Sequence, residues 1–301
     1  MLARESNGVL HRPPAMAVIL GGGLKPSPLQ ELSSVSVLDL PMGHGSTVLA
    51  ELLSLIEREW PDRPDPLPTR VIWGTPVPAP MSHAASPGLD VRLVQETKQW
   101  RGPAGVLKDV CEGLGDDGRI LLIEGARWAG AGLGGLFAAM EQTNADAVIG
   151  CNADESPAGA YLLRRSALES VSDQGFVDLK EQLLPRLAAS GRPVVVHHMP
   201  PPGILPVRTL ADYLEAVRQS RTAGSGWALI DASAVVDTTA LVYESVVMAG
   251  AMVGAGAVVA RSIVLAGGVV GPGTEVVDTV VLPGQSPRAR SGDSERRGVS
   301  R

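Results

Sequence analysis

The sequence predicts an α/β domain with a mostly parallel sheet, followed by a short β-solenoid. Between residues 16 and 222, short apolar runs alternate with segments of helical periodicity, which is the pattern of strands joined by crossover helices. From residue 227 to 285 the chain instead repeats a 17-residue unit rich in valine and glycine. We expect disordered ends at residues 1–15, before the first apolar run, and at residues 286–301, where apolar residues are scarce.

Composition excludes several classes of protein. The 301 residues carry a formal net charge of −6, and 45% are hydrophobic although only 3% are aromatic. We expect no nucleic-acid partner, because such proteins need a basic surface and aromatic stacking platforms. The uncharged residues 245–260 fall short of the roughly 20 apolar residues that span a bilayer, so we expect no membrane segment. Cys111 and Cys151 show neither metal-ligand spacing nor a disulfide framework, which favours a reducing cytoplasm.

The α/β domain contains short apolar runs that we predict to be strands. They are residues 16–20, 70–73, 89–95, 119–123, 146–150, 161–163 and 193–197. Helical periodicity predicts helices near residues 46–59, 103–114, 133–143, 179–190 and 210–221. We expect the first helix to begin more than twenty residues after the first strand. Ligands of such sheets bind at the carboxyl ends of the strands, so we expect the site there.

A glycine turn directly follows the first predicted strand. Gly21, Gly22 and Gly23 have no Cβ atoms, so their backbone N–H groups would be able to approach a phosphate. A simple connection explains three glycines equally well. The turn is not a dinucleotide-binding fingerprint, because no G-x-G-x-x-G motif leads into an adjacent helix.

Three 17-residue repeats begin at Val235, Met252 and Val269. Within a repeat the leading apolar residues step by five or six, which predicts short strands separated by small corner residues. The repeats align Gly250, Gly267 and Gly284 in one column, Val242, Val259 and Val276 in a second, and Val247, Val264 and Val281 in a third. The pattern resembles the left-handed hexapeptide-repeat β-helix. Its 17-residue form is similar to the C-terminal cap of sugar-nucleotide pyrophosphorylases.

Hexapeptide acyltransferases also contain such repeats, so acyl transfer is one alternative function. That chemistry needs a histidine near the coils, and no histidine follows His198. Three coils are also few for an acyltransferase. We therefore expect the solenoid to mediate association, either with a second copy of the chain or with a partner subunit.

Six further segments carry a resemblance to a known family. They are AVILGGG (17–23), RGPAGVLKDV (101–110), RILLIEGARW (119–128), AGAYLLRRSALE (158–169), LKEQLLPRLAASGR (179–192) and VRTLADYLEAVR (207–218). In this order they resemble the sugar-1-phosphate nucleotidyltransferases, or NDP-sugar pyrophosphorylases. The resemblance implies a Rossmann-like nucleotidyltransferase domain, whose reaction joins an NTP to a sugar 1-phosphate and releases pyrophosphate.

The sequence departs from this family at the groups that carry the chemistry. In the family a loop arginine and a lysine bind the triphosphate, and two aspartates hold the magnesium ion between the reacting groups. Here Lys25 is the only cation of the loop, and the two aspartates correspond to Ala126 and Pro206, which have no side-chain oxygen. Residues 151–157 replace a longer sugar-contacting segment. The sequence therefore favours a non-catalytic binding or regulatory subunit.

An active nucleotidyltransferase with a rearranged metal site stays open as an alternative. It would require magnesium, and Glu124 is the candidate catalytic residue, because it lies two positions before Ala126 on the same face of a strand. Asp39, Asp154 and Glu155 are further acidic candidates, although each is more simply explained as a solvated loop carboxylate.

The histidines indicate no metal site by themselves. His197 and His198 are adjacent on a predicted strand, so they point to opposite faces, and the sequence shows no third ligand for either. His44 is expected in a loop.

A nucleotide or sugar nucleotide is the partner that the resemblance implies. Its phosphates would lie on the glycine turn, and its base would lie beyond the end of a neighbouring strand. The residues expected to bind it are Gly21, Gly22, Gly23 and Lys25 at the phosphates, with Gln95 and Gly102 near the base.

Overall fold

The chain forms two compact units, Met1–Arg221 and Thr222–Arg301. The computed structural model describes residues 3–4, 10–22, 26–43, 45–61, 63–75, 77–81, 86–98, 100–221 and 224–284. The predicted disordered tail, residues 286–301, lies outside these ranges. Within residues 1–15, the short strands β1 (Ala3–Arg4) and β2 (Leu10–His11) pair antiparallel. No helix in the described ranges is long and apolar enough to cross a membrane.

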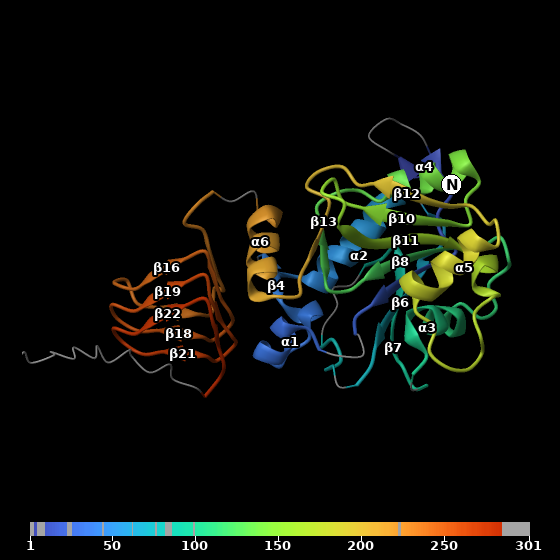
Figure 1. Cartoon of the computed structure of the whole chain (residues 1–301). Helices are drawn as coiled ribbons and strands as arrows, with labels where there is room; N and C mark the ends of the chain where they lie inside the picture. The colour runs from blue at the N-terminus through green and yellow to red at the C-terminus, as the bar shows by residue number, and fades with distance from the viewer. Residues whose placement is uncertain are drawn as a thin grey trace, which may run out of the picture. The chain divides into compact units, whose positions relative to one another are not determined.

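A seven-stranded sheet forms the centre of the first unit (Figure 1). Its strand order is β12-β10-β11-β8-β3-β6-β7, and only β11 runs antiparallel to its neighbours. The strands are β3 (Met16–Leu20), β6 (Leu67–Trp73), β7 (Leu89–Gln95), β8 (Arg119–Glu124), β10 (Ala147–Cys151), β11 (Pro157–Arg164) and β12 (Val194–His198). The predicted mostly parallel sheet is confirmed, with every predicted strand present.

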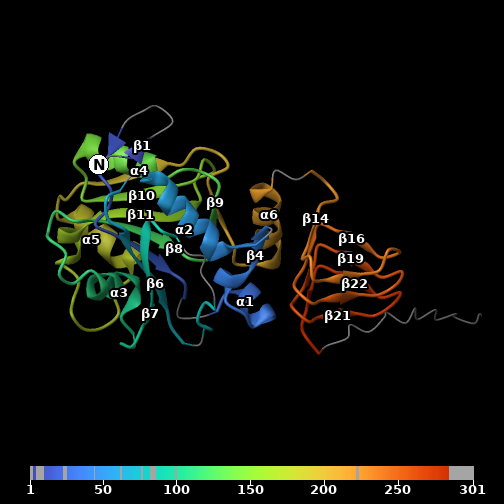
Figure 2. The same ribbon diagram turned by 180° about the vertical axis from the view of Figure 1, so that it is seen from behind.

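Helices cover both faces of this sheet (Figures 1 and 2). The helices of the first unit are α1 (Pro28–Ser33), α2 (Val48–Glu59), α3 (Gly102–Val110), α4 (Gly134–Thr143), α5 (Leu184–Ala189) and α6 (Leu210–Ser220). Helices α3 and α5 pack on one face, and α2 and α4 on the other. Trp60, which follows α2, packs edge-on against Phe137 of α4, with ring centroids 4.8 Å apart.

The prediction that no helix precedes residue 46 is wrong, because α1 begins at Pro28. Ser27 caps this helix by accepting a hydrogen bond from the Gln30 backbone N–H, and Pro28 occupies the first turn, where its missing N–H costs nothing. These are the usual signals of a helix N-terminus. They were overlooked because the helix has only six residues, too few to show a periodic apolar face.

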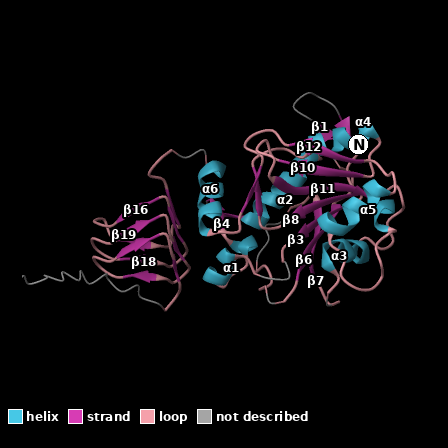
Figure 3. Cartoon of the chain, in the orientation of Figure 1, coloured by secondary structure: helices cyan, strands magenta, loops and turns pink. Residues whose placement is uncertain are grey.

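Short elements between the main ones complete the first unit (Figure 3). They are η1 (Val37–Asp39), β4 (Pro41–Gly43), β5 (Ser46–Thr47), β9 (Arg127–Ala129), η2 (Arg165–Leu168), η3 (Leu179–Leu183) and β13 (Ile204–Pro206). Strand β9 pairs antiparallel with β13. The helix predicted at residues 179–190 is split, since η3 is a π-helical turn that precedes α5. Such turns are frequent at functional sites.

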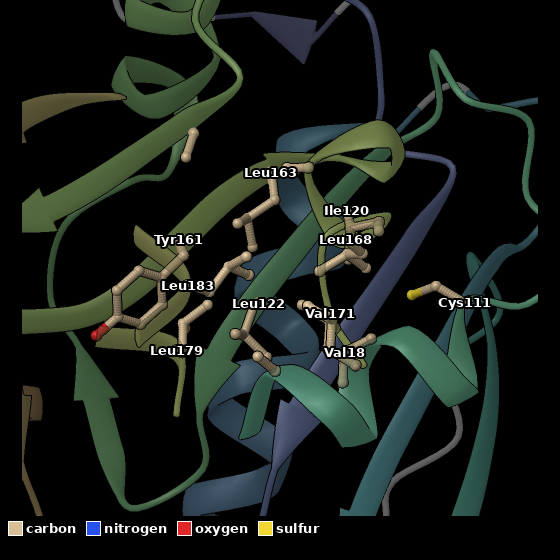
Figure 4. Packing of buried hydrophobic residues seen from close by; sticks show 14 of the residues in the cluster. Val18, Cys111, Ile120, Leu122, Tyr161, Leu163, Leu168, Val171, Leu179 and Leu183 are labelled. Atoms are coloured by element: carbon tan, nitrogen blue, oxygen red, sulfur yellow. The ribbon is translucent and has the colours of Figure 1, made fainter. Parts of the chain in front are cut away.

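The apolar core under α3 and α5 explains the position of the site (Figure 4). Val18 of β3 lies opposite Leu122 of β8, and Leu122 lies opposite Tyr161 of β11, so the three side chains form one row. Leu179 and Leu183 of η3 belong to the same cluster. Figure 4 shows the Tyr161 hydroxyl pointing away from the aliphatic side chains. The carboxyl end of β8 is therefore held beside η3.

Three parallel sheets make up the second unit, and they fit a β-helix. Every partner along each sheet is 17 residues away, as at Val242, Val259 and Val276, so the predicted columns are confirmed. A further strand, β14, extends one sheet before the first predicted repeat. The left hand of the helix stays a prediction. The strands are β14 (Ala228–Ile230), β15 (Val235–Val236), β16 (Leu241–Tyr243), β17 (Ser245–Val247), β18 (Met252–Val253), β19 (Val258–Ala260), β20 (Ile263–Val264), β21 (Val269–Val270), β22 (Glu275–Val277) and β23 (Val280–Val281).

The corners of the β-helix require left-handed backbone conformations. Gly250, Gly267 and Gly284 form one such corner, with φ of +66°, +69° and +73°. A second corner that the sequence did not reveal contains no glycine: Glu244, Arg261 and Asp278 have φ of 48°, 44° and 49°. The Arg261 guanidinium forms a bidentate ion pair with Asp278 one coil further, at 2.7 and 2.8 Å.

A ladder of hydroxyl groups joins successive coils beside this second corner. The Ser262 backbone N–H donates to the Ser245 hydroxyl at 3.0 Å, and the Thr279 N–H donates to the Ser262 hydroxyl at 3.1 Å. Ser245 and Ser262 are fully buried. The Ser262 hydroxyl also donates to the Ala260 carbonyl, so each hydroxyl satisfies backbone groups that water does not reach.

We expect Ser262→Ala to destabilise the β-helix by about 0.5–1.5 kcal/mol, because it removes the hydrogen bond that the Thr279 N–H donates to the Ser262 hydroxyl, while the Ala260 carbonyl still accepts the Asp278 N–H. Ser233→Ala is the matched control, since the Ser233 hydroxyl accepts the Gly250 N–H at an exposed corner. Its expected cost is within about 0.5 kcal/mol. Urea unfolding of the two variants measures both values, and equal costs would contradict the ladder's role.

Candidate functional site

Two adjoining cavities lie at the carboxyl ends of β3, β6 and β8, where the sheet predicts a site. Both are lined by Leu20, Gly22, Pro103 and Asp178. The first, here named the Glu124 cavity, has a volume of about 270 Å³ and is lined by, among others, Gln30, Glu124, Ala126, Tyr161, Lys180 and Arg208. The second, the Trp100 cavity, has a volume of about 420 Å³ and is lined by, among others, Trp73, Glu96, Lys98, Trp100, Gly102 and Phe176.

Glu124, the last residue of β8, is held by two cations. Its Oε2 accepts hydrogen bonds from Arg127 Nη2 at 2.6 Å and Nε at 3.1 Å. Its Oε1 lies 2.6 Å from Lys180 Nζ and 3.4 Å from the Tyr161 hydroxyl. The Arg127 side chain is only 9% exposed. Both carboxylate oxygens are therefore occupied by protein groups.

Burial and charge act in opposite directions on Glu124. Burial by itself raises the pKa of this carboxyl group, but the charge of Arg127 and the hydrogen bonds from Lys180 and Arg127 outweigh it and lower the pKa. Burial and the Glu124 charge raise the pKa of Tyr161, so its hydroxyl stays protonated as a donor. The cluster of one carboxylate with two cations keeps an excess positive charge at neutral pH.

Gly159 makes room for this ion pair. Its φ is +71°, and a Cβ at this position would lie 2.6 Å from Arg127 Nε and 2.9 Å from Glu124 Oε2. No other residue type fits without displacing the two side chains. Neither Gly159 nor Arg127 was predicted as a site residue, although both lie inside segments that resemble the family.

The two positions that the family resemblance assigns to metal-binding aspartates lie side by side. The Val207 backbone N–H donates to the Ala126 carbonyl at 2.9 Å, and Pro206 pairs with Arg127 across β9 and β13. Alanine and proline offer no side-chain oxygen, and the nearby Glu124 carboxylate is already neutralised. The residues at this site therefore do not fit a magnesium ion.

Positive charge lies near these two positions instead. Arg208 directly follows Val207 and lines the Glu124 cavity together with Lys180. Arg208 had a signal in the sequence, since it stands where the family motif has glycine.

A group of three metal-ligating side chains lies elsewhere. Within the described ranges it is the one such group, and it consists of Cys151, Glu155 and His198.

Gln30 lines the Glu124 cavity and has a buried, unpaired side-chain donor. Its side chain is 8% exposed, and its amide Nε2 has no hydrogen-bond partner among the described residues. A buried amide donor without a partner costs stability.

The glycine turn is partly engaged in contacts within the protein. The Gly21 N–H donates to the Ile72 carbonyl at 2.7 Å, so it is not available to a phosphate. A Cβ at Gly125 would lie 2.9 Å from the Gly21 Cα, so the absence of side chains serves close packing. Gly22 lines both cavities. Gly23 and Lys25 lie outside the described residues, as does His44.

Of the two residues expected near a base, Gly102 lines the Trp100 cavity and Gln95 does not. Gly102 lines the Trp100 cavity with φ of +68°, and a Cβ there would lie 2.6 Å from the Val177 carbonyl. Gln95 is exposed and lines neither cavity, because the next residue, Glu96, faces the Trp100 cavity instead. Burial and the charge of Asp109 raise the pKa of Glu96. The Trp100 cavity also exposes an aromatic surface, since Trp100 is 67% exposed.

The remaining acidic candidates hold loops. Asp39 accepts hydrogen bonds from the Met81 backbone N–H, and Asp154 accepts them from the backbone and hydroxyl of Ser156. Glu155 lies in the turn between β10 and β11, away from both cavities.

No family model matches the sequence, and no curated protein matches it. Among solved structures, a candidate glucose-1-phosphate thymidylyltransferase from Bacillus anthracis, in complex with sucrose, matches 70% of this chain and 97% of its own. Its TM-score is 0.52 and its identity 14%. Two structures of HddC from Yersinia pseudotuberculosis also match, each with a TM-score of 0.49, over 67% of this chain and 98% of HddC. The identity is 14% for HddC alone and 15% for HddC in complex with GMP-PN. The first likeness confirms the predicted nucleotidyltransferase-like fold.

We expect Glu124→Gln to lower the free energy of unfolding by about 1–3 kcal/mol at neutral pH, because Arg127 and Lys180 lose their shared counter-charge. The pKa of Glu124 is lower in the folded state, so its contribution is complete above the ordinary value of about 4.3. It is lost as the pH falls through the folded value. Urea unfolding against pH should show the difference between wild type and variant shrinking in acid.

Glu181→Gln is the control for this experiment, because Glu181 is exposed on the same π-helical turn. If the difference in the free energy of unfolding between wild type and Glu124→Gln does not depend on pH, the stabilisation does not come from the ion pair.

Proposed function

We propose that this protein binds a nucleotide or sugar nucleotide in the two adjoining cavities and does not catalyse magnesium-dependent nucleotidyl transfer. The protein would then act as a binding or regulatory subunit in sugar-nucleotide metabolism. The proposal is supported by the fold of the first unit and by the position of the cavities at the carboxyl ends of its strands.

The observation that carries the proposal is the ion-pair cluster of Glu124, Arg127 and Lys180. Nucleotidyl transfer depends on a metal that bridges the reacting phosphates and offsets their developing charge. The Glu124 carboxylate, which lies near the implied metal position, is held at 2.6 Å by each of two cations. Because Arg127 and Lys180 already neutralise that carboxylate, the cluster attracts an anion more strongly than it attracts a further cation.

The charges and surfaces of the cavities suit the two halves of such a ligand. Lys180 and Arg208 line the Glu124 cavity and offer cationic donors to phosphate oxygens, and Gln30 lines the same cavity. The Trp100 cavity, lined by Trp100 and Phe176, offers aromatic surface to a base. A ligand with phosphates at one end and a ring at the other would fill both cavities.

We expect the purified protein to release no pyrophosphate above background when incubated with Mg²⁺, nucleoside triphosphates and sugar 1-phosphates. The reason is that Ala126 and Pro206 have no side-chain oxygen and that Arg127 and Lys180 hold the Glu124 carboxylate. A coupled pyrophosphate assay measures this outcome. Robust release that Glu124→Gln abolishes would refute the proposal and establish the rearranged metal site in its place.

We expect binding of a nucleoside diphosphate sugar, measured by calorimetry in EDTA, to weaken about 10- to 150-fold in Arg208→Ala, the range set by a lost charge-assisted hydrogen bond of about 1.5–3 kcal/mol. Gln30→Leu should also weaken binding, yet it should not destabilise the free protein, because it removes a buried donor that has no partner.

Arg186→Ala is the matched control, since Arg186 is an exposed arginine of α5 outside both cavities. Affinity unchanged by Arg208→Ala and Gln30→Leu, or lost equally in Arg186→Ala, would contradict the placement of the phosphates. Association through the β-helix stays a prediction.

A further inference from the structure

A second cluster of reactive side chains lies at the carboxyl ends of β10 and β12. Cys151 ends β10, His198 ends β12, and the two residues are register partners in the parallel pair. Glu155 belongs to the turn that joins β10 to β11. This is the short segment that replaces a longer sugar-contacting portion in the resembling family. The sequence suggested no third ligand for His198, but the fold supplies two neighbours.

The turn is held in one shape by polar contacts. Asn152 is 7% exposed, donates to the Ile204 carbonyl at 3.0 Å and accepts the Ile204 N–H at 2.9 Å. Asp154 accepts both the N–H and the hydroxyl of Ser156. Glu155 itself has a φ of +64°, which is uncommon for a residue with a side chain. The carboxylate of Glu155 is thereby placed beside the two strand ends.

We propose that Cys151, Glu155 and His198 bind a divalent transition-metal ion of the zinc type. One ligand atom from each residue lies within 4.8 Å of the others. Glu155 Oε1 lies 3.8 Å from His198 Nδ1, and Glu155 Oε2 lies 3.9 Å from Cys151 Sγ. Tetrahedral zinc with bonds of 2.0–2.3 Å separates its ligand atoms by about 3.3–3.5 Å. Small side-chain rotations of Glu155 and His198, which are both exposed, would bring the three ligand atoms to that spacing.

The donor set selects the class of metal. A thiolate with an imidazole suits zinc and its neighbours in the transition series, whereas magnesium and calcium prefer oxygen donors alone. Binding converts the Cys151 thiol to a thiolate and releases one proton to solvent, because only the thiolate is a ligand. Three protein ligands leave the fourth tetrahedral position to water or to a group of another molecule.

Both strand ends and the turn would be cross-linked by such an ion. Cys151 is partly buried, while the side chains of Glu155 and His198 are 76% and 57% exposed, so an ion can enter from solvent. The site lies outside the residues that line the Glu124 and Trp100 cavities. The proposal is therefore independent of nucleotide binding.

Titration of the full-length, tag-free protein with Co²⁺ tests this site, with chelator-treated protein as the starting material. We expect one Co²⁺ per chain and a thiolate-to-cobalt charge-transfer band. Cys151→Ser should abolish the band, and His198→Gln should weaken binding more than the roughly 10- to 100-fold that loss of an outer-shell partner costs. His197→Gln is the matched control, because its side chain packs over Gly135 on the opposite face of β12.

A second readout does not depend on the variants. Zn²⁺ should slow the reaction of Cys151 with a thiol reagent at least tenfold, while the fully buried Cys111 stays unreactive with or without metal. Absence of the charge-transfer band in wild type, a band that survives in Cys151→Ser, or Cys151 reactivity unchanged by Zn²⁺ would each overturn the proposal.

Discussion

The ion-pair cluster at the end of β8 is the constraint on which the rest of the first unit's site depends. Arg127 and Lys180 occupy both oxygens of Glu124, so the cluster joins β8, β9 and the π-helical turn η3. Gly159 lacks a side chain where the pair needs room, and the Tyr161 hydroxyl extends toward the same carboxylate. The result is a cavity beside a carboxylate whose two oxygens are both taken up by protein groups.

The short turn between β10 and β11 stands where the resemblance implies a longer sugar-contacting segment. It brings the Glu155 carboxylate beside the ends of two neighbouring strands. Asn152 secures the turn through the Ile204 backbone, which lies just before the position of the second lost aspartate. The positions that the family resemblance assigns to metal-binding aspartates are therefore joined through Asn152 to the turn that carries Glu155.

Most of the fold could be predicted from periodic patterns. Valine columns spaced by 17 residues predicted the β-helix, because each coil must bury its apolar face on the next. Short apolar runs predicted each strand of the main sheet. Helix α1 and the corner at Glu244, Arg261 and Asp278 were missed. The first is too short to be periodic, and the second depends on an ion pair and hydroxyl ladder between coils rather than on glycine.

By itself the sequence determined which groups are present: no side-chain oxygen at Ala126 or Pro206, a glycine turn after the first strand, and a shortened segment before Ala158. Tertiary structure decided which of these groups act together. Glu124 forms an ion pair because the fold places Lys180 beside it. Gln95 does not line the Trp100 cavity, because successive strand residues point to opposite faces. His198 lies beside Cys151, which belongs to a different strand. Electrostatic and coordination chemistry act over a few ångströms in space, and distance along the chain does not reveal those separations.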